Sequence, residues 1–290
     1  MSDAPALFAP LGRPRVMGVV NVTPDSFSDG GRYATSDAAI AHGERLLAEG
    51  ADLVDIGGES TRPGATRPLV GEELDRVVPV IRALAGSGAV VSVDTMRAEV
   101  AEAAIEAGAA VVNDVSGGLA DPRILEVAAA AGTPYVAMHW RAHSDRMRDF
   151  AVYDGPGGVV AAVCAELSAR VEAMLAAGIA ADRIVLDPGL GFAKGAGHNW
   201  ELLRHLDALL GLGHPVLVGA SRKSFLGTLL ADADGTPRDV EQREHASAAL
   251  TVHLARQGVW GVRVHDVRAT RDVLAVLEEL DRPTAEEALR

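Results

Sequence analysis

The sequence predicts an α/β fold, a single-domain (β/α)8 (TIM) barrel, from two observations. Short runs of β-branched residues alternate with longer alanine-rich segments of helical period along the whole chain. Eight strand-plus-helix units in 290 residues fit this barrel, which usually needs ~250 residues. An open, doubly wound sheet has the same local alternation, but the GxGxxG fingerprint of a dinucleotide fold is missing after the first expected strand.

The expected elements follow one another in the order that a barrel requires. The expected strands are 15–22, 52–58, 89–94, 110–114, 134–139, 183–187, 215–220 and 259–265. The expected helical segments between them are 36–50, 71–86, 97–109, 121–132, 155–178, 199–211 and 241–258. We expect residues 15–282 to form the barrel, 1–14 an N-terminal extension and 283–290 a tail, with long loops after the first and second strands.

Composition narrows the class of protein. Because 48% of residues are apolar but only 4% aromatic, aliphatic and alanine side chains must fill the interior. A net charge of −13 without a basic stripe argues against nucleic-acid binding. The single cysteine, Cys164, cannot form an intrachain disulfide, and its helical setting favours a packing role over a nucleophilic one.

Targeting signals are also missing from the sequence. Three prolines and an aspartate interrupt the first 16 residues, where a signal peptide needs a basic start and an unbroken apolar stretch. No apolar run approaches the ~18 residues that a membrane-spanning helix requires. We therefore expect a cytoplasmic protein that does not bind membranes.

Polar groups follow every expected strand, where the active sites of such barrels lie. They are Asn21, Asp55, Asp94, Thr95, Asn113, Asp114, His139, Asp187, Ser221, Arg222, Lys223, Ser224, Arg263, His265 and Asp266. Any single aspartate or asparagine among them could instead cap the next helix. Two carboxylates near a carboxamide and a lysine, however, predict a pocket for a flat heterocycle with N–H and carbonyl groups on its edge.

A cationic sector accompanies this pocket in an otherwise acidic chain. Its members are Arg62, Arg67, Arg222, Arg263 and His265. Because a guanidinium fork matches phosphate or carboxylate oxygens, these residues indicate a ligand that carries an anion beside its ring.

Seven motifs make the resemblance to a known family specific. They are GVVNVTPDSFSDGG (18–31), DIGGESTRPGA (55–65), SVDTMRAEVAEAAIEAGA (92–109), VNDVSGG (112–118), LDPGLGFAKGAGHN (186–199), VGASRKSFLG (218–227) and RVHDV (263–267). With them the chain resembles the dihydropteroate synthases, the pterin-binding sulfonamide targets of bacterial folate (tetrahydrofolate) biosynthesis.

The resemblance implies substrates, residue roles and partners. The substrates would be 6-hydroxymethyl-7,8-dihydropterin diphosphate and 4-aminobenzoate, joined by a transferase to give dihydropteroate and diphosphate. The pterin would lie against Asp94, Asn113, Val115, Met138, Asp187, Phe192, Gly219 and Lys223. The diphosphate would lie against Arg263, His265 and Asn21, with Asn21 beside a Mg²⁺ ion, and the aminobenzoate against Phe27, Thr61, Arg62, Pro63, Lys223 and Ser224. A homodimer is expected.

Charges then suggest the mechanism. Asp94, Lys223, Arg263 and His265 are the expected catalytic residues. We expect a dissociative, cation-like substitution with no enzyme nucleophile, in which Asp94 stabilises the electron-poor methylene carbon. A corrinoid-dependent pterin methyltransferase and a non-catalytic paralogue are the alternatives. His139 is left without a role, as a rim histidine with satisfied hydrogen bonds.

Overall fold

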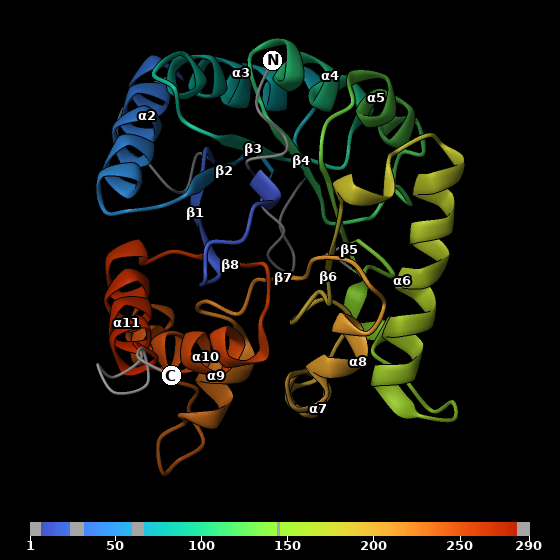
Figure 1. Ribbon diagram of the computed structural model, residues 1–290, viewed down its shortest axis with the longest axis vertical. Coiled ribbons are helices and arrows are strands. Elements are labelled where there is room, and N and C mark those ends of the chain that lie inside the picture. Colours follow the sequence, from blue (N-terminus) through green and yellow to red (C-terminus); the bar gives the residue numbers. More distant parts are fainter. Residues whose placement is uncertain (1–6, 24–31, 60–66, 144–145, 283–290) are drawn as a thin grey trace, which may run out of the picture.

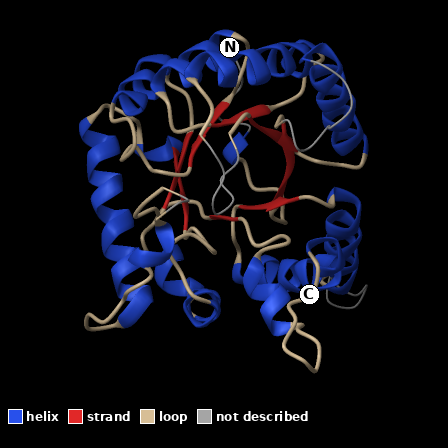
Figure 2. Ribbon diagram, turned by 180° about the vertical axis from the view of Figure 1, so that it is seen from behind, coloured by secondary structure: helices blue, strands red, loops and turns tan. Residues whose placement is uncertain are grey.

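The structure, a computed structural model, describes residues 7–23, 32–59, 67–143 and 146–282. Eight parallel strands form one sheet in the order β6-β5-β4-β3-β2-β1-β8-β7. A bridge between Leu186 and Val216 joins the two edge strands, and the Leu186 amide donates to the Pro215 carbonyl at 2.9 Å. The sheet therefore closes into a barrel, as the sequence predicts, and helices surround the ring of strands in Figure 2.

Strands and helices alternate along the chain, as Figure 1 shows. The strands are β1 (Arg15–Asn21), β2 (Leu53–Gly57), β3 (Val91–Asp94), β4 (Val111–Asp114), β5 (Tyr135–Met138), β6 (Ile184–Asp187), β7 (Leu217–Val218) and β8 (Gly261–Val264). The α-helices are α2 (Arg32–Ala48), α3 (Val70–Gly86), α4 (Ala98–Glu106), α5 (Arg123–Ala131), α6 (Gly158–Ala176), α7 (Ala196–Arg204), α8 (Leu206–Leu210), α9 (Ser224–Leu229), α10 (Glu244–Gln257) and α11 (Val267–Leu280). Short 3₁₀ turns are η2 (Met147–Phe150), η3 (Ala181–Arg183) and η4 (Val240–Arg243).

Each strand lies within its expected range, whereas the helices differ in several places: α2, for example, begins at Arg32 and not at the expected residue 36, and α11 has no expected counterpart. The expected helix at 199–211 starts three residues earlier and is divided at His205 into α7 and α8. Helix α9 occupies a segment in which the sequence predicts no helix, since six residues are too few to show a helical period. Cys164 is partly buried on α6 and packs against the core, which confirms its expected packing position.

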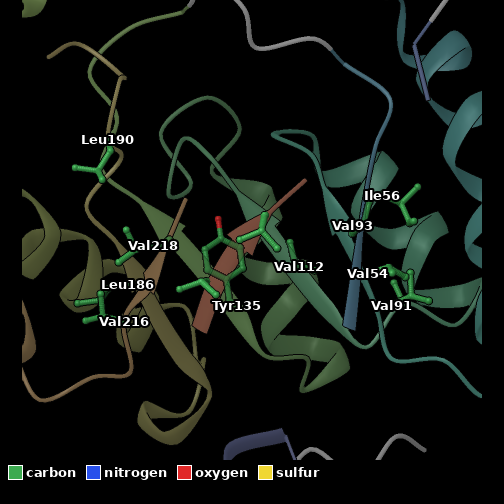
Figure 3. Packing of buried hydrophobic residues seen from close by; sticks show 14 of the residues in the cluster. Val54, Ile56, Val91, Val93, Val112, Tyr135, Leu186, Leu190, Val216 and Val218 are labelled. Atoms are coloured by element: carbon green, nitrogen blue, oxygen red, sulfur yellow. The ribbon is translucent and has the colours of Figure 1, made fainter. Parts of the chain in front are cut away.

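Two apolar layers hold the barrel together. The outer layer lies between the strands and the surrounding helices; Figure 3 labels Val54, Ile56, Val93, Val112 and Leu186 among its members. A smaller cluster fills the barrel interior and consists of Met17, Leu53, Val111, Val136, Val185 and Leu217. Because successive side chains of a strand point to opposite faces, all strands except β3 and β8 contribute residues to both layers.

No helix within the described ranges is both long and apolar enough to cross a bilayer. The loops that follow β1 and β2 include residues 24–31 and 60–66, which lie outside the described residues, so their expected length is not tested.

Candidate active site

The inward face of the barrel changes from apolar to polar towards the carboxyl ends of the strands. Two residues beyond Leu53, Val111, Val136, Val185 and Leu217 come Asp55, Asn113, Met138, Asp187 and Gly219. The period of two residues in a strand places these groups on the same inward face, one level above the apolar cluster. Parallel strands bring their carboxyl ends to one rim, so these polar groups lie at that rim.

Arg263 on β8 is the centre of one half of the rim. Its Nε donates to Asp55 Oδ2 at 2.6 Å and its Nη2 to Asp94 Oδ2 at 2.9 Å. Asn113 Nδ2 donates to the same oxygen of Asp55 at 2.9 Å. The four side chains, from β2, β3, β4 and β8, form one hydrogen-bonded cluster.

Asp55 is the site residue that the sequence interpretation did not assign. It is fully buried, and its Oδ1 has no hydrogen-bond partner. A buried carboxylate oxygen without a donor is costly, because the charged group has lost its water. Its position two residues after buried Leu53 was the available signal for an inward-facing group.

Asp187 and Lys223 form the other half of the rim. Asp187 Oδ1 accepts from the Gly189 amide at 2.7 Å. A Cβ atom on Gly219 would lie 4.0 Å from Asp187 Oδ2 and 3.8 Å from Arg263 Cβ, so the two charged residues flank this glycine. Lys223 Nζ donates to the Leu190 carbonyl. The missing side chain at Gly219 leaves space between the two halves.

An apolar wall completes the rim. Met96, Val115 and Met138 form a buried cluster, against which Phe192 and Trp140 pack. Lys223 Nζ lies 4.5 Å from the centroid of the Phe192 ring. A wall of apolar side chains beside convergent polar groups is the usual architecture of a site for a small planar ligand.

Burial shifts the pKa values of three charged groups towards neutral pH. It raises the pKa of Asp94 to about 7, although the Arg263 cation acts in the opposite direction. It also raises the pKa of Asp187, against the effect of Lys223. Burial lowers the pKa of Lys223 to about 8, while Asp187 raises it. Shifts of this kind are concentrated at functional sites.

Fewer contacts define the positions of the other expected site residues. His265 Nδ1 lies 3.0 Å from Ser221 Oγ, which also accepts from the His265 amide at 3.3 Å. Asn21 ends β1 opposite Gly57 of β2, and Ser224 is the exposed first residue of α9. The expected aminobenzoate residues Phe27, Thr61, Arg62 and Pro63 lie outside the described residues.

Two other strand-end residues have structural contacts. Asp114 points away from the interior and accepts from Tyr135 Oη at 2.5 Å and from Ser116 Oγ at 2.7 Å. His139 is buried, with its ring between Glu166 and Lys194. The former anchors the β4 loop to β5, and the latter is the satisfied rim histidine that the sequence suggests.

Mg²⁺ fits the residues only in combination with an anionic ligand. Within the described ranges, no three histidine, cysteine, aspartate or glutamate side chains form a group that could hold a metal. Asn21 offers a carboxamide oxygen, which is the ligand type Mg²⁺ prefers. Since Mg²⁺ keeps several waters and often binds substrate phosphates, one protein oxygen beside a diphosphate is a sufficient donor set.

Comparison with known proteins gives the relationship. The profile of a family described as "Pterin binding enzyme" matches residues 17–265. The chain belongs to the pterin-binding enzyme family. Within this family it groups with the dihydropteroate synthases, which are transferases: the one from Mycobacterium leprae is 53% identical over 265 residues, covering 91% of this chain and 92% of that protein.

Solved pterin-binding enzymes have the same fold. The Xanthomonas albilineans dihydropteroate synthase with 4-aminobenzoic acid has a TM-score of 0.85 at 48% identity, covering 93% of this chain and 94% of that one. The same organism's enzyme in complex with 7,8-dihydropteroate has a TM-score of 0.83 at 43% identity, covering 97% and 99%. Identity at this level extends beyond the fold to the family.

Proposed function

We propose that this chain is a dihydropteroate synthase, a folate-pathway transferase that condenses 6-hydroxymethyl-7,8-dihydropterin diphosphate with 4-aminobenzoate to give 7,8-dihydropteroate and diphosphate. One observation carries the proposal: Asp94, Asn113, Asp187 and Arg263 all reach the same rim, beside an apolar wall. The ligands of the solved relatives, 4-aminobenzoic acid and 7,8-dihydropteroate, are consistent with it.

The pterin ring would lie between the two halves of the rim. Carboxylates accept hydrogen bonds from ring N–H and amino groups, whereas a carboxamide and an ammonium group can donate to ring nitrogens and the carbonyl. The proposed residues are Asp94, Asn113, Asp187 and Lys223 at the edge of the ring, with Val115, Met138, Phe192 and Gly219 along its faces. Gly219 supports this placement, because its open space adjoins both Asp187 and Arg263.

The diphosphate would lie beside Arg263, His265 and Asn21. Asp55 and Asp94 each accept one N–H of the Arg263 guanidinium, which carries five donors, so further donors can serve phosphate oxygens. Bound Mg²⁺, with Asn21 as its protein ligand, would neutralise charge on the diphosphate. The Arg263 guanidinium would stabilise the leaving group most when its bond to carbon breaks.

The reaction would proceed as a dissociative substitution. As the carbon–oxygen bond to the diphosphate breaks, the pterin methylene becomes electron-poor, and the Asp94 carboxylate stabilises that positive charge. The aminobenzoate nitrogen then forms the new carbon–nitrogen bond and loses a proton to water or to the released diphosphate. Phe27, Thr61, Arg62, Pro63, Lys223 and Ser224 would surround the aminobenzoate, so a sulfonamide should compete with it. No covalent enzyme intermediate is needed.

A single assay separates the candidate functions. Purified protein, Mg²⁺ and both substrates should yield dihydropteroate and diphosphate in equal amounts, and omission of 4-aminobenzoate should abolish the pterin product. A corrinoid-dependent methyltransferase would release no diphosphate, and a non-catalytic paralogue would bind the pterin without turnover. Either result would contradict the proposal.

The proposal also includes the extent of the catalytic domain, the oligomeric state and the cellular location. We take residues 15–282 as the catalytic barrel, a homodimer as the assembly and the cytoplasm as the location. Light scattering coupled to size-exclusion chromatography tests the homodimer, because a dimer has twice the mass of the chain.

A further inference from the structure

Lys194, in the loop between β6 and α7, is surrounded by three acceptors. Its Nζ lies 2.8 Å from His139 Nδ1 and 3.0 Å from the carbonyl oxygens of both Gly189 and Phe192. An ammonium group has three N–H donors and accepts nothing. The three partners therefore use the whole hydrogen-bonding capacity of this side chain within the protein.

The same contacts fix the protonation of His139. Burial raises the pKa of Glu166, but hydrogen bonds from His139 and Arg141 lower it to about 2, so this carboxylate only accepts. The proton of the neutral ring is therefore assigned to Nε2, 3.0 Å from Glu166 Oε2, and Nδ1 is the acceptor for Lys194. Burial lowers the pKa of His139 to about 4, so the ring is neutral at physiological pH. Glu166 on α6 is held in turn by Arg141. A directional chain of hydrogen bonds thus runs from α6 through the end of β5 to the loop after β6.

That loop supplies two contacts to the proposed pterin site. Phe192 packs against the apolar wall, and the Leu190 carbonyl accepts from Lys223. The two carbonyls that Lys194 holds, those of Gly189 and Phe192, lie on either side of Leu190 along the chain. Fixing them fixes both the Phe192 ring and the acceptor that orients Lys223.

We propose that Lys194, oriented by the Nδ1 atom of His139, is a positioning residue that holds the loop after β6 in the shape that binds the pterin ring. It acts through Phe192 and Leu190 and takes no part in bond making. The inference rests on the proposed function, because the loop matters for catalysis only if the rim is the pterin site.

Four variants separate positioning from general stability. Lys194→Met removes all three hydrogen bonds and keeps the apolar stem. His139→Asn keeps an acceptor near the position of Nδ1 but cannot reach Glu166, whereas His139→Gln reaches Glu166 and loses the acceptor for Lys194. Arg204→Met, at an exposed position on α7, is the control for the loss of one cation from the same strand–helix unit.

The readouts are KM for each substrate, kcat, calorimetric affinity for the pterin diphosphate and the melting temperature. Lys194→Met and His139→Gln should raise the KM and Kd for the pterin diphosphate about tenfold, the size expected from losing one hydrogen bond to a charged group. His139→Asn and Arg204→Met should stay within about threefold of wild type, since Asn retains an acceptor for Lys194 and Arg204 lies outside the chain of hydrogen bonds.

Two results would overturn the inference. One is an unchanged pterin affinity in Lys194→Met and His139→Gln together with a lower melting temperature, which would show stabilisation alone. The other is equal loss of affinity in both His139 variants. Should Lys194→Met fail to fold, the His139 pair decides, because both variants retain Lys194. Absence of turnover by the wild-type protein would instead contradict the proposed function, while calorimetry would still test the loop.

Discussion

Asp94 is a nearly buried carboxylate that shares one cation, Arg263, with a second carboxylate, Asp55. In the proposed mechanism the Arg263 cation favours the charged form of Asp94, whose carboxylate would stabilise the electron-poor methylene carbon. Replacing Asp94 by asparagine preserves its shape but removes the charge, so we expect kcat to fall by about tenfold or more, the effect of losing about 1.4 kcal/mol of transition-state stabilisation. Steady-state kinetics with both substrates saturating measures it.

Asp114 provides the matched control for that variant. It is fully buried, faces outward and bonds to Tyr135 and Ser116. Asp114→Asn should therefore lower the melting temperature and leave kcat of the folded enzyme unchanged. If Asp94→Asn instead retains kcat within about threefold, the electrostatic role of this carboxylate is wrong.

The pH dependence of kcat/KM should follow the two shifted groups. Asp94 must be ionised, so activity should rise as pH increases through its pKa of about 7. Lys223 must be protonated, so activity should fall as pH increases through its pKa of about 8. A narrow bell with its maximum between these values is expected.

Asp94→Asn also tests whether the rise of kcat/KM on the acid side of the pH profile comes from Asp94. In this variant the rise with pH through about 7 should disappear, and the fall that Lys223 causes should remain but move to lower pH, because the Asp94 charge that raises the pKa of Lys223 is lost. A profile that is flat between pH 6 and 9 in the wild type would contradict both assignments.

At the scale of residues, the sequence predicted which side chains lie together at the rim but not which of them form hydrogen bonds with one another. The strand period places Asn113 inward and Asp114 outward, so the alternation alone separates a site residue from a structural one. The bond from Arg263 to Asp55 could not be predicted, because it depends on the rotation of β8 relative to β2 around the barrel. Local sequence contains no information on that closure.

The loop after β6 connects the barrel to the site, and Gly189 is the position at which its backbone is most closely packed. This glycine has φ +66°, and a Cβ atom there would collide with the His139 carbonyl oxygen. Gly189→Ala should destabilise the protein by about 2 kcal/mol or more, as both the left-handed backbone and the contact oppose it. Chemical denaturation measures the change.

Gly197 is the control glycine for this element. It lies in α7, and a Cβ atom there would meet nothing within 4 Å. Gly197→Ala should raise stability by about 0.5–1 kcal/mol, because alanine favours the helix and loses less backbone entropy on folding. Equal effects of the two substitutions would show that the backbone of Gly189 carries no special constraint.

At the scale of elements, the bounds of the strands could be predicted better than those of the helices. Each strand has a compact β-branched core between a helix and a polar end, which limits its register. The division of the expected 199–211 helix at His205 could not be seen, because the apolar pattern continues through the break. Helix α9 is shorter than the two turns that a period needs.

The whole molecule is closed at the end opposite the site. Phe8 stacks on Trp260 with ring centroids 5.7 Å apart, and Arg13 forms a two-pronged ion pair with Asp52 at 2.7 and 2.8 Å. Residues 7–14 therefore contact the barrel, although the expected boundary at residue 15 stays a prediction.

Phe8→Ala tests the separation of stability from catalysis across the barrel. It should lower the free energy of unfolding by about 1–2 kcal/mol, since Phe8 is partly buried against an aromatic neighbour. Both KM values should remain those of the wild type, because the site lies at the far end. A changed KM for either substrate would show that the two ends are coupled.

The most direct measurement of the central claim is a crystal structure of the protein with a pterin ligand. We expect the ring at the rim, hydrogen-bonded to Asn113 and Asp187, with one face against the apolar wall of Met138 and Phe192. A pterin bound elsewhere on the molecule, in a protein that still turns over, would contradict the account.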